Sequence, residues 1–164
     1  MAVVRSFISR HKILNFVEED IDWVYKFYKE NWEKFSIIHY GITHTSGIKT
    51  EDWKSKEEYK KCYEYFWNQE QFNKVYLFWK NTNSKNTTFY DWAKPSLDHI
   101  IPKSKGGSIT DYHNWQFITV FENLAKRDMS QEEWEQFQQE TNSTSDYYYK
   151  SIERNIEYEQ SISG

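Results

Sequence analysis

Residues 96–128 of this 164-residue chain, SLDHIIPKSKGGSITDYHNWQFITVFENLAKRD, decide the fold of its second half. Residues 97–101 and 115–120 are apolar runs that contain the β-branched and aromatic side chains typical of strands. The stretch between the two runs is rich in Gly, Ser, Asp and Asn, which favour turns. Residues 121–128 then favour a short helix. The stretch therefore predicts a β-hairpin followed directly by a helix.

Helices are expected on both sides of this hairpin. Apolar residues at three- and four-residue spacing predict an amphipathic helix over 18–35. Ser55 and Glu58 match a capping box, which marks the start of another helix. That second helix gathers one apolar face, formed by Tyr59, Cys62, Tyr63, Phe66 and Trp67.

Further segments complete the expected organisation. Residues 71–80 are expected to continue as a helix after a break, and Ser130 with Glu133 forms a second capping box that opens another helix. Residues 36–50 contain several β-branched residues and two glycines, which favour a short strand or a loop. A last helix is expected near 145–160. Together these patterns predict an α+β protein.

Aromatic residues make up 20% of the chain, although its mean hydropathy is only −0.96. Large rings bury more area per residue than aliphatic side chains, so a few of them close a core, and a disordered chain is not expected. Trp53, Trp67, Trp79 and Trp92 either pack in such a core or stack on nucleic-acid bases. The single cysteine, Cys62, permits no internal disulfide and no cysteine-based zinc site.

The net charge of −4 hides an uneven distribution of charged residues. Residues 49–105 carry eleven Lys and eight acidic residues, whereas residues 128–164 carry two basic and nine acidic residues. A polyanionic partner is therefore expected to meet the middle of the chain. No run of eighteen apolar residues is present, and residues 1–16 lack the apolar segment of a signal peptide. A cytoplasmic location without a membrane partner is expected.

Three marks stand at fixed spacing within residues 96–128. The first is Asp98-His99-Ile100-Ile101-Pro102, followed by Ser104 and Gly106-Gly107. The second is Asn114, fifteen positions after His99, and the third is Asn123, nine positions further on. In order, spacing and predicted elements, these marks resemble the HNH, or ββα-metal, endonuclease family over about 40 residues. The resemblance implies a ββα-metal nuclease core embedded in flanking α-helices.

The resemblance also implies a role for each marked residue. His99 resembles the general base that takes a proton from the attacking water. Asn114 resembles the structural Asn that ties the hairpin loop and holds His99 in place. Asp98 and Asn123 resemble the two protein ligands of one divalent cation bound to the scissile phosphate. Because both ligands supply oxygen, the resemblance implies Mg²⁺ or Mn²⁺ as the cofactor.

Several neighbouring residues are candidates for related roles. Glu122 or Asp128 is an alternative to Asn123 as the second metal ligand, and His113 is an alternative metal or phosphate contact. Basic side chains beside the three marks are expected to bind phosphate groups of DNA. These side chains are Lys103, Lys105, Lys126 and Arg127.

Structural zinc is not expected in this chain. Many members of the family hold their core with CxxC pairs that bind zinc, and a chain with one cysteine has none. Packing of apolar side chains is expected to replace that zinc. The side chains expected to do so are Trp92, Trp115, Phe117, Phe121 and Leu124.

Three regions follow from these expectations. Residues 1–93 are expected to form a mainly helical region that packs on the core and contacts DNA. Residues 94–130 are expected to form the nuclease core, and residues 131–164 an acidic helical extension. The resemblance implies a metal-dependent endonuclease of phage or homing type that hydrolyses a phosphodiester in double-stranded DNA. A monomer would nick one strand, and a homodimer would cut both. The alternatives are a catalytically idle DNA-binding or packaging-accessory protein with the same fold, and a nuclease toxin or RNase.

Overall fold

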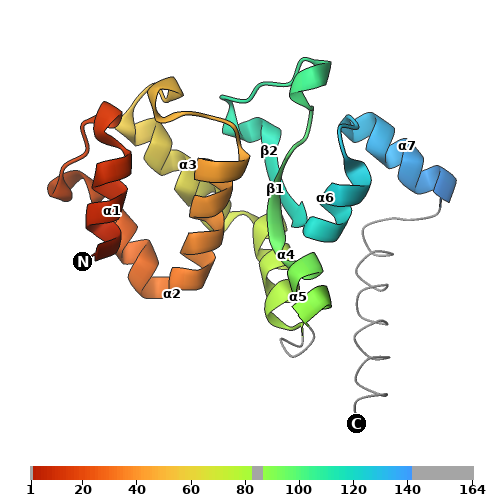
Figure 1. The fold of residues 1–164 in the computed structure, drawn as a ribbon, viewed down its shortest axis with the longest axis horizontal. Helices are drawn as coiled ribbons and strands as arrows, with labels where there is room; N and C mark the ends of the chain where they lie inside the picture. The colour runs from red at the N-terminus through yellow and green to blue at the C-terminus, as the bar shows by residue number, and fades with distance from the viewer. Residues whose placement is uncertain (1, 83–86, 142–164) are drawn as a thin grey trace, which may run out of the picture. The chain divides into compact units, whose positions relative to one another are not determined.

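A computed structural model describes residues 2–82 and 87–141 of the chain (Figure 1). The helix expected near 145–160 lies outside the described residues. Most of the described residues are helical, and two strands form an antiparallel sheet, which confirms the α+β class. None of the helices in these two stretches is long and apolar enough to cross a membrane. The chain divides into two compact units, residues 1–69 and 70–164.

Helices build the first unit. The Ser55 hydroxyl accepts a hydrogen bond from the backbone N–H of Glu58 at 3.1 Å, which confirms the predicted helix start. All five residues of the predicted apolar face of that helix are buried. The α-helices of the unit are α1 (Ala2–Arg10), α2 (Asp22–Tyr40) and α3 (Lys56–Asn68).

The prediction of a strand or a loop over 36–50 is wrong. Helix α2 and the π-helical turn that follows it, Gly41–Thr45, cover most of this segment. Ile37, Ile38 and Ile42 are buried, with exposed fractions of 7%, 0% and 1%. Burial of these side chains in a helical arrangement therefore outweighs their intrinsic preference for strands.

A chain of hydrogen bonds runs through the interior of this unit. It joins His39 Nδ1 to the Tyr63 hydroxyl (2.7 Å), Tyr63 to the Tyr59 hydroxyl (2.8 Å), and Tyr59 to His11 Nε2 (2.6 Å). At its end, His11 Nδ1 lies 2.7 Å from the carbonyl oxygen of Phe7. Burial lowers the pKa of both histidines, which favours their neutral forms. Because a carbonyl only accepts, a neutral His11 donates from Nδ1 and accepts at Nε2, so that Tyr59 donates to His11 and Tyr63 donates to Tyr59.

The buried histidines predict that acid destabilises the protein. Burial, and to a smaller extent the neighbouring positive groups, lower the pKa of His39 to about 3. Since an unfolded histidine has a pKa of about 6.5, the unfolded chain binds the extra proton as the pH falls. We expect His39 alone to reduce the free energy of unfolding by about 2 kcal/mol between pH 7 and pH 5. Urea denaturation followed by circular dichroism at the two pH values measures this loss.

His39→Asn is the matched control for this measurement. The asparagine amide can donate to the Tyr63 hydroxyl as His39 Nδ1 does, but it does not titrate. The loss of stability between pH 7 and pH 5 should therefore shrink by about 2 kcal/mol in the variant. An unchanged pH dependence would show that His39 is not the source.

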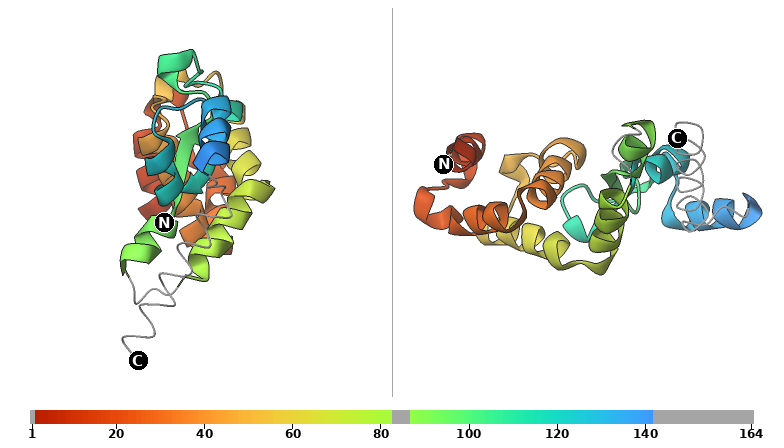
Figure 2. Two further views of the ribbon diagram at one scale, coloured as in Figure 1. Left: turned by 90° about the vertical axis from the view of Figure 1, so that its right-hand side faces the viewer. Right: turned by 90° about the horizontal axis from the view of Figure 1, so that it is seen from below.

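The second unit contains the predicted hairpin. Strands β1 (Pro95–His99) and β2 (Trp115–Thr119) lie side by side (Figures 1 and 2) and pair antiparallel. In this register Asp98 lies opposite Gln116 and His99 lies opposite Trp115. Helix α6 follows β2 directly, which confirms the predicted order of elements. The α-helices of the unit are α4 (Glu70–Lys80), α5 (Thr87–Ala93), α6 (Val120–Lys126) and α7 (Gln131–Thr141).

The two faces of the hairpin meet different helices. Phe117 faces α4, where its ring meets Phe72 edge-on with centroids 4.9 Å apart. Ser96 and Asp98, two positions apart on β1, face α6 and bond to its side chains. Helix α4, which packs on the hairpin in this way, belongs to the same compact unit, which begins at Glu70.

The predicted packing around the hairpin is confirmed only in part. Trp115 and Phe117 are fully buried, each with 0% of its surface exposed. In contrast, Trp92 is 37% exposed and Leu124 is 65% exposed, so their assignment to the core is wrong. Phe121 is half-buried and stacks on Trp92, with ring centroids 5.1 Å apart.

Candidate functional site

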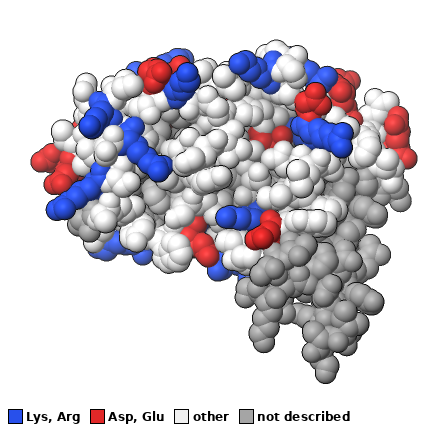
Figure 3. All heavy atoms as spheres, in the orientation of Figure 1, with Lys and Arg blue, Asp and Glu red and all other residues white. Residues whose placement is uncertain are grey.

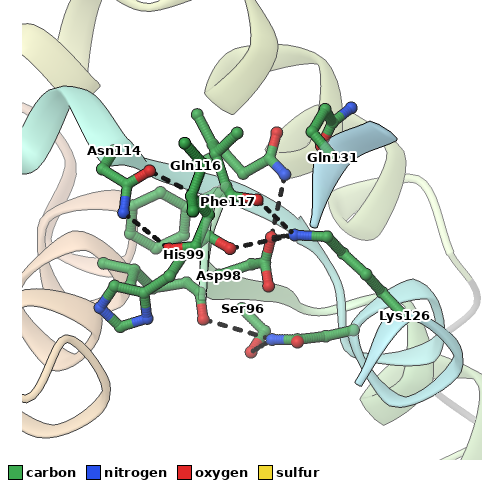
Figure 4. A network of polar contacts seen from close by, with 12 residues as sticks. Ser96, Asp98, His99, Asn114, Gln116, Phe117, Lys126 and Gln131 are labelled. Carbon is green, nitrogen blue, oxygen red and sulfur yellow. Dashed lines mark hydrogen bonds and ion pairs between the residues drawn. The ribbon is translucent and has the colours of Figure 1, made fainter. Parts of the chain in front are cut away.

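Asp98 anchors a polar network on the α6 face of the hairpin (Figure 4). Its side chain is buried, with 6% exposed, and its Oδ2 atom accepts hydrogen bonds from two side chains. Lys126 Nζ donates at 2.5 Å, and Gln116 Nε2 donates at 2.9 Å. Gln116 was not among the expected site residues, although the register that pairs it with Asp98 follows from the hairpin.

Lys126 lies in the interior rather than at the surface where a phosphate contact would lie. None of its surface is exposed. Besides Asp98, its ammonium donates to the carbonyl oxygens of His99 at 3.0 Å and Ile100 at 3.3 Å. These three acceptors use all three of its protons, so none is left for DNA. Lys126 instead joins the last turn of α6 to the end of β1.

Asn123 also contacts β1 from α6. Its Nδ2 donates to the Ser96 hydroxyl at 3.0 Å and to the carbonyl oxygen of Leu97 at 3.2 Å. Because a carbonyl only accepts, these contacts settle which end of the amide is nitrogen. The Oδ1 atom of Asn123, and likewise Oδ1 of Asp98, has no hydrogen-bond partner among the described residues.

These two oxygens are suitable ligands for Mg²⁺ or Mn²⁺. Both belong to side chains on the α6 face, and both are hard donors of the kind these cations prefer. The described residues hold no cluster of three or more His, Cys, Asp or Glu side chains suited to a metal ion. A site with Asp98 and Asn123 as its protein ligands would not form such a cluster. The ammonium of Lys126 already pairs with Asp98, and its positive charge would repel a metal cation bound to the same carboxylate.

His99 ends strand β1 and points to the other side of it. Neighbouring residues of a strand alternate between its faces, and Figure 4 shows the imidazole directed away from the Asp98–Lys126 pair. The ring is half-buried and lies edge-on to Trp115, with centroids 6.4 Å apart. A base at His99 and a cation at Asp98 would therefore approach a phosphate from the two sides of the strand end.

Asn114 ties the loop that follows β1. Its Oδ1 accepts from the backbone N–H of Ile101 at 3.0 Å. Its Nδ2 donates to the carbonyl oxygens of Ile101 and Ser108, both at 2.9 Å. The backbone N–H of Ile100 donates to the Asn114 carbonyl at 2.8 Å. The amide therefore holds both ends of the loop next to His99, whereas its part in catalysis stays a prediction.

The two glycines of the motif are required by the shape of this loop. Gly106 has φ of +86°, in the left-handed region that favours glycine. At Gly107, a Cβ atom would lie 1.7 Å from the carbonyl oxygen of Ile101, where no side chain fits. Backbone N–H groups of Lys105 and Gly107 donate to the carbonyl of Pro102, which closes the turn.

The remaining basic residues differ in their surroundings. Lys103 is exposed and pairs with no described acid. Lys105 lies 3.1 Å from the Glu133 carboxylate on α7, which lowers the pKa of that carboxyl. Arg127 is exposed just beyond α6, with a φ of +52° that is strained for a residue other than glycine. Lys103 and Arg127 are thus the cations most available to a phosphate. On the face shown in Figure 3, basic and acidic side chains are interspersed, so any attraction for DNA is local.

The alternative site residues have other contacts. Glu122 is 1% exposed, and it caps α6 through Thr119, whose hydroxyl accepts from the Glu122 backbone N–H and donates to its carboxylate. His113 is exposed, and its Nδ1 lies 2.8 Å from the Asp111 carboxylate. Asp128 is exposed beyond the end of α6. The geometry does not favour any of these over Asn123, whose free oxygen lies on the face that bears Asp98.

The fold and the site define an α+β protein with a strand–strand–helix unit that carries one acidic, one imidazole and two amide side chains at its polar end. No protein-family model, curated protein or solved structure matches the chain. The function is therefore inferred from the residues and their geometry.

Proposed function

We propose that the chain is a metal-dependent endonuclease that hydrolyses a phosphodiester in double-stranded DNA, with residues 94–130 as its ββα-metal core. The observation that carries this proposal is the arrangement of the four marked residues. Asp98 and Asn123 reach the same face from β1 and α6, and each keeps one oxygen without a partner among the described residues. Asn114 holds the loop beside His99.

Each residue has a chemical task in this proposal. Asp98 and Asn123 would hold Mg²⁺ or Mn²⁺, which supplies charge stabilisation for the phosphate in the transition state and for the leaving oxygen. His99 accepts a proton from the attacking water at a ring nitrogen, the task that imidazole side chains most often perform in general base catalysis. Lys103 and Arg127 bind neighbouring phosphates, and the products carry 5′-phosphate and 3′-hydroxyl ends.

A second candidate function is that of a catalytically idle DNA-binding protein. One specific observation favours it. Lys126 already places a positive charge on Asp98, where a nuclease of this kind needs a metal ion. An ammonium neutralises the carboxylate but does not polarise a phosphate as a divalent ion does.

Nicking of supercoiled plasmid distinguishes the two functions. The purified chain is incubated with plasmid in 10 mM Mg²⁺ or Mn²⁺, and the products are separated on an agarose gel. We expect conversion to nicked circles with either metal and none with EDTA. Linear product that grows with protein concentration would indicate that a homodimer cuts both strands.

A gel-shift measurement on the same plasmid shows whether the chain binds DNA without cutting it. A chain that binds the plasmid but leaves it supercoiled in both metals is not an endonuclease, and the idle DNA-binding function is then favoured. A chain that neither binds nor cuts DNA contradicts both.

A further inference from the structure

Gln116 is a half-buried side chain of β2 to which the proposed chemistry gives no task. The register of the sheet places it directly opposite Asp98 on the neighbouring strand. Because residues paired in this way point to the same face of a sheet, the Gln116 amide reaches the Asp98 carboxylate (Figure 4). Its Nε2 atom donates to Oδ2 of Asp98 at 2.9 Å. The amide is therefore in a position to set how this carboxylate is presented.

Both side chains that donate to Asp98 use the same oxygen. Lys126 Nζ lies 2.5 Å from Oδ2, the atom that also accepts from Gln116. A carboxylate oxygen has two lone pairs, so these two hydrogen bonds occupy both of them. Oδ1 accepts from none of the described residues. The protein thus uses one oxygen of Asp98 fully and leaves the other for a ligand.

The two donors are themselves held in place. Lys126 is fully buried and also donates to the carbonyl oxygens of His99 and Ile100. Gln116 is fixed at its backbone by the pairing of β2 with β1. Because one donor comes from α6 and the other from β2, a turn of the Asp98 carboxylate away from this orientation would break both hydrogen bonds. Oδ2 therefore stays directed toward the protein.

The number of oxygens that a carboxylate can offer affects which cation it suits. Ca²⁺ takes more oxygen ligands than Mg²⁺ and binds carboxylates through one or both of their oxygens. Mg²⁺ demands nearly ideal octahedral geometry and keeps several water molecules, and Mn²⁺ also favours octahedral oxygen sites. Asp98 and Asn123 each have one oxygen to offer. Such a site suits the two smaller cations better than Ca²⁺.

We propose that Gln116 is a positioning residue that, with Lys126, keeps Asp98 a one-oxygen ligand and so makes the metal site select Mg²⁺ or Mn²⁺ over Ca²⁺. The inference rests on the proposed endonuclease function, because it needs a cation at Asp98 and Asn123. Lys126 carries a charge as well as a hydrogen bond, whereas Gln116 is neutral. Replacement of Gln116 therefore tests the selection without a change of charge, because it frees a lone pair of Oδ2 for a larger cation.

Binding of Mn²⁺ and Ca²⁺ to the full chain without DNA tests this role. Electron paramagnetic resonance measures free Mn²⁺, and competition against Mn²⁺ gives the affinity for Ca²⁺. Gln116→Met keeps a long, uncharged side chain but removes the donor. We expect it to lower Mn²⁺ affinity by about tenfold, a typical effect for a residue that hydrogen-bonds a metal ligand. The ratio of Mn²⁺ affinity to Ca²⁺ affinity should fall by at least about fivefold, because Ca²⁺ gains access to the second oxygen.

Two further variants separate positioning from a structural effect. Gln116→Thr suits a strand but is too short to donate to Asp98, so it should lower the ratio as Gln116→Met does. Gln131→Met makes the matched replacement at a half-buried glutamine of α7 that is labelled in Figure 4. The Gln131 amide donates to Glu135 rather than to Asp98, so the ratio should stay unchanged in this variant.

Contrary results distinguish this role from the function on which it rests. If the unmodified chain binds no Mn²⁺, the metal site of the proposed endonuclease is wrong, and the role of Gln116 is wrong with it. If the unmodified chain binds Mn²⁺ but the affinity ratio is unchanged in Gln116→Met and Gln116→Thr, the role of Gln116 alone is overturned. An equal drop of the ratio in Gln131→Met overturns it as well.

Discussion

Replacement of His99 by alanine is expected to slow plasmid nicking by about 10²- to 10⁴-fold, the usual contribution of a general base. The imidazole stands at the end of β1, on the side of the strand opposite Asp98. Its removal deprives the attacking water of a proton acceptor but leaves both proposed metal ligands in place. The rate of nicking in Mg²⁺ at pH 7.5, measured under single-turnover conditions, gives the loss directly.

Two controls separate a catalytic loss from a structural one. Mn²⁺ affinity should be the same in His99→Ala as in the unmodified chain, because His99 is not a proposed ligand. His113→Ala, at the exposed histidine paired with Asp111, should nick at nearly the original rate. The proposed role of His99 fails if His99→Ala cuts as fast as the original chain, and a large loss in His113→Ala instead would transfer the role to that residue.

Replacement of Lys126 by methionine is expected to lower the free energy of unfolding by roughly 3–5 kcal/mol, the usual cost of breaking a buried ion pair. The variant leaves the Asp98 carboxylate buried without its counter-charge and leaves the carbonyl oxygens of His99 and Ile100 without their donor. Urea denaturation followed by circular dichroism measures the change.

Matched variants show whether the pair itself is responsible. Lys103→Met removes an exposed lysine of the same hairpin and should change stability by less than about 0.5 kcal/mol. Adding Asp98→Asn to Lys126→Met should recover part of the loss, because the isolated charge is gone. A loss below about 1 kcal/mol in the single variant would contradict the prediction.

Addition of Mg²⁺ makes the same variant informative about function. If Asp98 and Asn123 hold a divalent cation, Mg²⁺ replaces the missing positive charge and stabilises Lys126→Met more than it stabilises the unmodified chain. Equal stabilisation of the two would favour the idle DNA-binding function.

Local patterns were enough to predict much of the second unit and the start of helix α3 in the first unit. The β-branched and aromatic runs on either side of a turn-rich loop predicted β1 and β2 to within about two residues at each end. The capping boxes predicted the starts of α3 and α7, where Ser55 and Ser130 accept from the backbone N–H groups of Glu58 and Glu133. Such signals act within a few residues, so a sequence shows them without knowledge of the fold.

Segments whose structure depends on distant contacts were predicted less well. Ile37, Ile38 and Ile42 favour a strand by intrinsic preference, yet their burial keeps them helical. Leu124 and Trp92 have the composition of core residues, but Leu124 is 65% exposed, and Trp92, which stacks on Phe121, is still 37% exposed. Burial is a property of the whole arrangement and cannot be read from spacing alone.

The sequence by itself determined the order and spacing of Asp98, His99, Asn114 and Asn123, and with them the hairpin and the helix that carry these residues. The tertiary structure alone decided what surrounds them. Lys126 was expected to contact a phosphate, but in the tertiary structure it is a buried partner of Asp98. The last turn of α6 ends against β1, which keeps the Lys126 ammonium away from solvent. Spacing along a chain sets which side chains can meet, whereas the packing of elements sets which charges must be paired.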